Sequence, residues 1–126
     1  MWFHRKKIDD EQWEVLNKEV MRLTREEKLE EALAQGTELF ELGKKCFGEK
    51  HGNTATALNN LGIIHTLRKD FDEAESCLLA ALQISEKVSG RISSAVAIVN
   101  MNLARLYTFK AQMINDTLAA CKEQRT

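Results

Sequence analysis

The stretch Thr54-Ala-Thr-Ala-Leu-Asn-Asn-Leu-Gly62 decides the fold, because a related stretch, Val96-Ala-Ile-Val-Asn-Met-Asn-Leu-Ala104, follows it 42 positions later. The same offset places Glu31-Ala32 on Glu73-Ala74. A fixed period of this length is typical of repeat proteins, in which each repeat is one supersecondary unit. The sequence therefore predicts a chain built from similar units in series.

Apolar residues within the period recur at helical spacing. Leu58, Leu61 and Ile64 are three residues apart, and a second apolar stripe begins at Phe71 with intervals of three and four residues. Side chains at these intervals lie on one face of an α-helix. Each unit is therefore predicted to contain two helices, whose apolar faces are buried by packing on each other and on the next unit.

Three such helix pairs are expected, in units of about residues 10–47, 54–88 and 94–123, within a single domain of residues 1–126. The helices are predicted over residues 10–23, 25–47, 54–68, 71–88, 94–110 and 112–123. Thr24, followed three residues later by Glu27, predicts a capping box at the start of the second helix.

The last unit is degenerate, because the offset puts Asp116 where Ala74 stands and the last helix then does not pack in the same register. Ile114, Leu118 and Cys121 still form an apolar stripe. The last helix is therefore expected to be shifted or terminating, unless the chain is the beginning of a longer array.

The composition is globular and excludes several classes of function. The chain is 44% hydrophobic and 29% charged, and it contains no proline, which favours uninterrupted helices. Its 18 basic and 19 acidic residues nearly cancel, so no nucleic-acid partner is expected. Apolar runs are far shorter than the roughly 20 residues that span a bilayer, so no membrane association is expected.

Chemistry-bearing motifs are missing from the sequence. Cys46, Cys77 and Cys121 are odd in number and far apart, which fits reduced thiols and, without an export signal, a cytoplasmic location. Glycine-rich phosphate loops, nucleophile elbows and metal-ligand spacings are absent. The chain is predicted to be no enzyme and to need no cofactor or metal.

The middle unit resembles the tetratricopeptide repeat, whose signature is W-x-x-L-G-x-x-Y followed by A-x-x-x-F. The matching residues are Leu58-x-x-Leu61-Gly62-x-x-His65 and Ala74-x-x-x-Leu78. The 42-residue period exceeds the usual length and is similar to the longer repeats of the kinesin light chain family. The resemblance implies an all-α fold of helix-turn-helix units, stacked as a short right-handed α-solenoid of about three helix pairs.

The first unit departs from the family pattern at two positions. Val20 stands where the family has a small residue, and Gly36 stands where it has a large apolar one. Small residues at such positions let paired helices approach closely. The first unit is therefore interpreted as a capping variant.

The resemblance also implies a binding site, because the first helices of successive tetratricopeptide units line a concave groove that holds a peptide or partner helix. Carried over by the repeat match, the predicted groove residues are Asn17, Lys18, Asn59, Asn60, Ile63, Met101, Asn102 and Arg105. Asparagine amides can donate to and accept from a peptide backbone. The basic side chains favour an acidic ligand with apolar anchors, although the charged residues taken singly are also compatible with solvated helix faces.

The first functional hypothesis is therefore an adaptor or scaffold that binds another protein or peptide. The alternative is a structural protein that self-associates into a homo-oligomer, because an uncapped end of the stack exposes apolar surface that an identical chain can cover.

Overall fold

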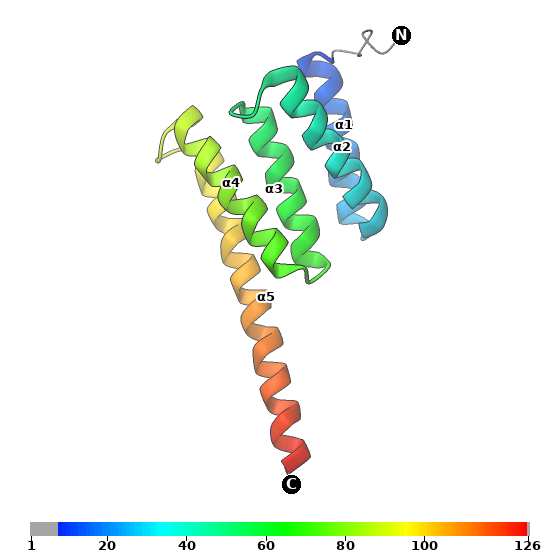
Figure 1. Ribbon diagram of the computed structural model, residues 1–126, viewed down its shortest axis with the longest axis vertical. Helices are drawn as coiled ribbons and strands as arrows, with labels where there is room; N and C mark the ends of the chain where they lie inside the picture. The colour runs from blue at the N-terminus through cyan, green and yellow to red at the C-terminus, as the bar shows by residue number, and fades with distance from the viewer. Residues whose placement is uncertain (1–7, 126) are drawn as a thin grey trace.

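The computed structural model describes residues 8–125, which form five helices in series and no strand (Figure 1). The helices are α1 (Asp10–Arg25), α2 (Leu29–Phe47), α3 (Gly52–Leu67), α4 (Phe71–Ser89) and α5 (Ser94–Arg125). Each helix packs on the next, and α3 also touches both α1 and α5. The predicted all-α repeat fold is confirmed; residues 1–7 and 126 of the predicted domain lie outside the described part.

Helix α1 begins with a reciprocal cap. The Asp9 side chain accepts a hydrogen bond from the Gln12 backbone N–H at 2.8 Å, and the Gln12 side chain accepts one from the Asp9 N–H at 3.1 Å. These bonds satisfy two of the backbone donors that a helix start leaves without partners. The capping box predicted from Thr24 and Glu27 is wrong, because the Thr24 hydroxyl donates to the Val20 carbonyl instead and Glu27 lies in the turn before α2.

The turn inside each helix pair depends on one residue in the left-handed region. Glu27 (φ 58°) joins α1 to α2, and Lys69 (φ 67°), 42 positions later, joins α3 to α4. The next position in this series is Ala111, which is helical within α5. Alanine is the strongest helix former, so the chain has a local reason to continue the helix at this point.

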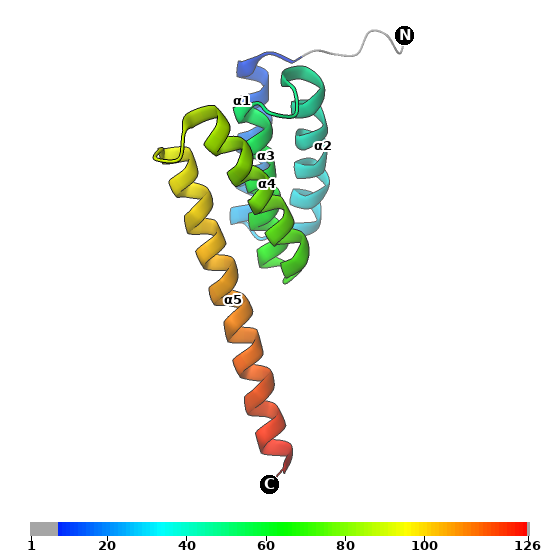
Figure 2. The same ribbon diagram turned by 60° about the vertical axis from the view of Figure 1, so that its left-hand side comes forward.

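The separate helix predicted over residues 112–123 is therefore wrong. Helix α5 runs without interruption for 32 residues and projects beyond the other four helices (Figure 2). The stack consists of two helix pairs and one long helix instead of three pairs. None of the helices found between residues 8 and 125 is long and apolar enough to cross a membrane.

Helix α3 lies at the centre of the stack and separates two apolar clusters. Its Ala57 and Ile64 pack in a cluster with α1 and α2, whereas its Leu58 packs in a cluster with α4 and α5. Buried residues surround most of the axis of α3, and Thr56, Ile63 and Leu67 form the strip that is exposed or partly buried. The positions of α1 and α5 are therefore both fixed by contact with one central helix.

Close approach within each pair depends on a small residue opposite a large one. A Cβ atom at Gly62 would lie 2.5 Å from the side chain of Leu78, so any larger residue there would force Leu78 or the helices α3 and α4 to shift. In the first pair the sizes are exchanged: Val20 stands at the Gly62 position, and Gly36 stands at the Leu78 position. A Cβ at Gly36 would lie 3.7 Å from Cγ1 of Val20, and nearer still to Leu61 (3.1 Å) and Ile64 (3.3 Å) of α3. The two departures from the family pattern are thus one compensated change.

Candidate functional site

Asparagine side chains link the first helices of successive units. The Asn60 amide of α3 donates to the Asn17 side-chain oxygen of α1, and the Asn102 amide of α5 donates to the Asn59 oxygen of α3 at 2.9 Å. The two bonds are equivalent, because the 42-residue offset maps Asn17 onto Asn59 and Asn60 onto Asn102. This asparagine ladder holds α1, α3 and α5 side by side.

Three of the four ladder residues are buried, with exposed fractions of 6% for Asn17, 9% for Asn59 and 7% for Asn60. Asn102 is partly buried. A buried amide needs a hydrogen-bond partner, and the ladder supplies it. The geometry therefore indicates that these predicted groove residues hold neighbouring helices together. Sequence reasoning missed their pairing, although each donor follows its acceptor by 43 positions, one more than the repeat period.

The other predicted groove residues lie on the outer surface of the same three helices. Lys18, Met101 and Arg105 are exposed, Met101 by 67%, and Ile63 is partly buried. Apolar neighbours on the three helices extend this surface. We call it the first-helix face and define it by Lys18, Met21, Arg25, Thr56, Ile63, Leu67, Ile98, Met101, Asn102, Arg105 and Phe109.

In the described part of the chain, basic side chains on the first-helix face have no acidic partner. Within residues 8–125, no ion pair involves Lys18, Arg25 or Arg105. By contrast, Arg22 on another side of α1 pairs with Glu19 and Glu26, and its guanidinium lowers the pKa of both carboxyl groups. The first-helix face therefore presents three basic side chains that make no ion pair within residues 8–125, beside the exposed Glu14, which the offset also places on this face.

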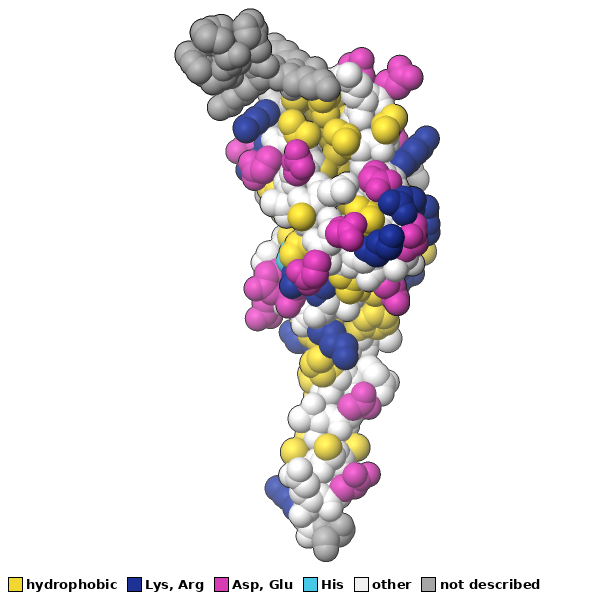
Figure 3. Space-filling view, turned by 90° about the vertical axis from the view of Figure 1, so that its right-hand side faces the viewer, with side chains coloured by type: hydrophobic (Ala, Val, Ile, Leu, Met, Phe, Trp, Pro, Cys, Tyr) yellow, Lys and Arg dark blue, Asp and Glu magenta, His cyan; other side chains and the backbone are white. Residues whose placement is uncertain are grey.

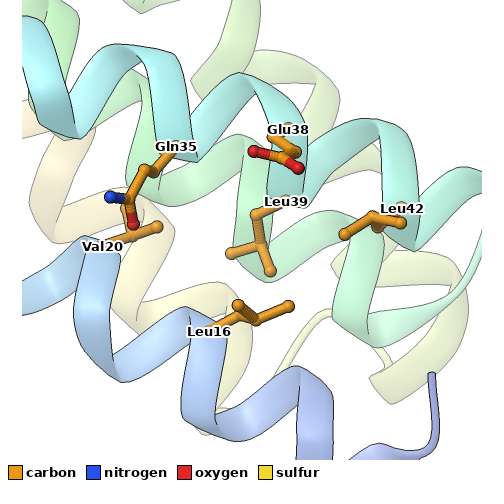
Figure 4. A pocket seen from close by; sticks show the side chains of 6 residues that line it. All are labelled: Leu16, Val20, Gln35, Glu38, Leu39 and Leu42. Carbon is orange, nitrogen blue, oxygen red and sulfur yellow. The ribbon is translucent and has the colours of Figure 1, made fainter.

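The side of α1 and α2 has a different character. Acidic and basic side chains are interspersed there, with apolar side chains between them (Figure 3). Side chains of the two helices face each other around a hollow of about 60 Å³ (Figure 4), lined by Leu16, Val20, Gln35, Glu38, Leu39 and Leu42. This volume is too small for a peptide, so the hollow is a packing gap between the paired helices.

A larger hollow of about 590 Å³ lies between the α3–α4 turn and the projecting half of α5. It is lined by Thr66, Leu67, Lys69, Phe71, Phe109, Gln112, Met113, Asp116, Thr117 and Ala120. Leu67 and Phe109 belong also to the first-helix face, so the two surfaces are continuous. Sequence reasoning missed this hollow because it expected the chain to turn at residue 111.

A second hollow, of about 350 Å³, lies at the opposite end of the same face between α3, α4 and α5. It includes Thr56 and Ile98 of the first-helix face, together with Val88 from α4. The face thus has a recess at each end. Both recesses combine apolar side chains with a few polar ones, which is the usual lining of a ligand site.

The described part of the chain holds no cluster of metal-binding side chains, and its cysteines are unpaired. No group of three or more His, Cys, Asp or Glu side chains within residues 8–125 could hold a metal ion. Cys46, Cys77 and Cys121 are free thiols. Burial, with a smaller contribution from Glu73, raises the pKa of the Cys77 thiol, which disfavours the reactive thiolate.

Comparison with known proteins identifies the repeat. The family model of the tetratricopeptide repeat matches residues 23–87 and again residues 53–113, which together cover more than half of the chain. No curated protein matches the chain. Tetratricopeptide repeats are protein–protein interaction modules. With two overlapping matches, paired helices and a repeated inter-unit bond, the chain belongs to the tetratricopeptide repeat family.

Proposed function

We propose that the chain is an adaptor module that binds an acidic segment of a partner protein on its first-helix face. The observation that carries the proposal is the combination, on α1, α3 and α5, of exposed apolar side chains with basic ones that make no ion pair within residues 8–125. Lys18, Arg25 and Arg105 supply the positive charge, and Met101 and Phe109 are 67% and 40% exposed.

The charges favour an acidic partner because they have no counterions among the described residues. An exposed ion pair contributes only about 0.2–1 kcal/mol, so the basic residues would set orientation and specificity more than affinity. Most of the affinity would come from burial of apolar side chains. The recess of about 590 Å³ beside Phe109 and that of about 350 Å³ beside Ile98 are the places where such anchors fit.

The asparagine ladder has a supporting role in this proposal. Asn17, Asn59 and Asn60 are buried and bonded to one another or to Asn102, so they keep the three helices in register beneath the ligand. Asn102 is partly buried and also lines a small recess with Ile63 and Arg105. Among the four asparagines, Asn102 is the one placed to reach a bound peptide.

A charge-reversal experiment tests the proposal. Binding of a fluorescent peptide library, with acidic residues flanking apolar ones, would be compared between the parent chain and a Lys18→Glu/Arg105→Glu variant. We expect the variant to lose binding of the peptides that the parent selects while its helical circular dichroism is unchanged. Reversal of two exposed lysines on α2 and the following loop, Lys45→Glu/Lys50→Glu, is the matched control and should leave binding intact.

Two results would count against the proposal. The first is a parent chain that selects no peptide from the library. The second is a set of selected peptides that bind the Lys18→Glu/Arg105→Glu variant as tightly as the parent. A further Met101→Ser variant separates the apolar contribution, because it removes an exposed hydrophobic side chain from the same face without adding charge or altering the core.

A further inference from the structure

Six residues of α5 recur at alternating intervals of three and four positions. They are Ala104, Tyr107, Ala111, Ile114, Leu118 and Cys121, and we call them the α5 seam. All six are exposed and none is charged. This spacing is the heptad pattern by which two helices pack along their length.

The first residue of the seam, Ala104, is equivalent to a residue of the preceding unit that another helix covers. The 42-residue offset maps Ala104 onto Gly62 of α3, which is buried and packs directly against Leu78 of α4. No helix of the described chain covers Ala104 in this way, because α5 does not turn at Ala111 and continues outward instead. The residues that would form the second helix of this unit project beyond the stack (Figure 2).

Another tetratricopeptide unit is a poor match for this end of the stack. In the ladder, the acceptor positions of α1 and α3 are Asn17 and Asn59, but the equivalent residue of α5 is Met101. A thioether is a weak acceptor, so the ladder bond that joins successive units ends at α5. What covers the seam is therefore expected to differ from a further repeat.

We propose that a second copy of the chain covers the seam, with the two α5 helices packed antiparallel about a two-fold axis between residues 112 and 113. The projecting half of each α5 then takes, on its partner, the place that a second helix of the third unit would occupy. The unbroken helix through Ala111 keeps this segment from reaching the same surface in its own chain. The projecting half of α5 thus covers the seam of the second copy, because it does not reach the seam of its own chain.

Side-chain size favours the antiparallel direction. Around this axis Ala111 packs opposite the partner's Ile114, Tyr107 opposite the partner's Leu118, and Ala104 opposite the partner's Cys121. A parallel pair would instead place Ala111 against Ala111, which leaves that layer of the contact poorly filled. Close packing requires small residues opposite large ones, as the antiparallel pair has them at its centre.

Two polar residues fix the register. Moving the axis to residue 109 would lengthen the contact by one heptad, but it would bury the amide of Asn100 against the partner's Leu118 without a hydrogen-bond partner. It would also bring Lys110 next to the partner's Lys110. Asn100 is polar and exposed, although the offset places it on the buried Leu58 of α3, so the apolar seam begins after residue 100.

The contact that results is long enough for a reversible dimer. Residues 104–121 extend for about 26 Å along the helix axis, and each copy contributes all six seam residues. Ile114 and Leu118 are 52% and 55% exposed in the single chain, so both have much surface left to bury. Their burial supplies the driving force for association.

Sedimentation velocity over a concentration series, under reducing conditions, tests the proposal. We expect the parent chain to shift from monomer to dimer with rising concentration, and a Leu118→Asp variant to raise the dissociation constant at least about tenfold, because the introduced charge would be buried in the dimer. Leu118 lies in the projecting half of α5, so the substitution leaves the core intact. Ile98→Asp, on the first-helix face and 52% exposed, is the matched control that should still dimerise.

Oxidative cross-linking tests the direction and the register. An Ala104→Cys variant should form a disulfide between the introduced thiol and Cys121 of the partner subunit, because only directly opposed residues bring their Cα atoms within the roughly 7 Å that a disulfide allows. Adding Cys121→Ser should abolish this bond. An Ala97→Cys variant, which would reach Cys121 of the partner subunit only if the axis lay at residue 109, should not cross-link.

Several results would overturn the proposal. They are a parent chain that stays monomeric, a dimer insensitive to Leu118→Asp, a parent dimer cross-linked through Cys121 to Cys121, and a cross-link that forms with Ala97→Cys instead of Ala104→Cys. Because the variants that test peptide binding alter a different face, either proposal can fail without the other.

Discussion

Asn102 of α5 donates its side-chain amide to Asn59 of α3 at 2.9 Å, and the equivalent bond joins Asn60 of α3 to Asn17 of α1. One bond thus recurs at two interfaces between units. Because the bonded asparagines are largely buried, these bonds contribute to the stability of the stack more than to contact with a ligand.

Replacing Asn60 by alanine should destabilise the chain. The substitution leaves the Asn17 side chain buried without this partner, which costs about 1–3 kcal/mol of unfolding free energy. Urea denaturation followed by circular dichroism measures the effect. Because the two residues share one bond, the Asn17→Ala/Asn60→Ala double variant should lose less than the sum of the single losses. Strict additivity would show that the bond makes no net contribution.

Gly62→Ala should be among the most damaging small substitutions in the chain. The added Cβ would lie 2.5 Å from Leu78, and overpacking of this kind costs about 1–3 kcal/mol. Gly52→Ala is the control, since no atom lies within 4 Å of a Cβ there and helix propensity favours alanine. Thermal melts of both variants separate the two effects, because overpacking lowers the melting temperature of Gly62→Ala, whereas the lower backbone entropy of alanine raises that of Gly52→Ala. Equal melting temperatures for the two would contradict the close approach of α3 and α4.

Tyr107 should titrate above the ordinary range for a phenol. Its hydrogen bond to Glu75 and the nearby carboxylate charge raise its pKa. It is the only tyrosine in the chain, so the ultraviolet absorbance of the phenolate reports it directly. Since the folded pKa is raised, the bond's contribution to stability is present below the unfolded pKa and is lost as pH rises through the folded one. Glu75→Gln should move the titration midpoint down, and an unmoved midpoint would refute the assignment.

The thiols should differ in reactivity. Cys121 is exposed, whereas Cys77 is partly buried and its pKa is raised by burial and by Glu73. At mildly alkaline pH, and at a concentration where the chain is monomeric, an alkylating reagent should therefore modify Cys121 well before Cys77, and peptide mapping by mass spectrometry would show the order. In denaturant the two rates should converge. Faster alkylation of Cys77 in the folded chain would contradict its packing.

Most of the fold could be predicted from the sequence, because a 42-residue period and helical apolar spacing leave few alternatives. The end of the stack could not. The turn residues Glu27 and Lys69 have positive φ values but are not glycines, so nothing in their side chains marks the turn. At the third position of the series Ala111 favours a continued helix, but its helix propensity alone does not exclude a turn when the two earlier turn residues are also not glycines.

The site could be predicted in outline only. The repeat match placed Lys18, Met101 and Arg105 on outward-facing positions, and these side chains are exposed. The same repeat match placed the asparagines on this face, where their amides were expected to bond to a peptide backbone. Their pairing depends on α1, α3 and α5 lying side by side, a tertiary relationship that helical periodicity alone does not encode.

The exchanged sizes of Val20 with Gly36 and Gly62 with Leu78 also bear on how the chain folds. Two similar helix pairs in one chain can in principle mispair. If α1 took the place of α3 beside α4, Val20 would collide with Leu78; if α3 took the place of α1 beside α2, Gly62 would face Gly36 with no large side chain between them. Only the native partners combine one large and one small residue. The exchanged sizes therefore favour the native helix pairs and disfavour the exchange of helices between neighbouring repeats.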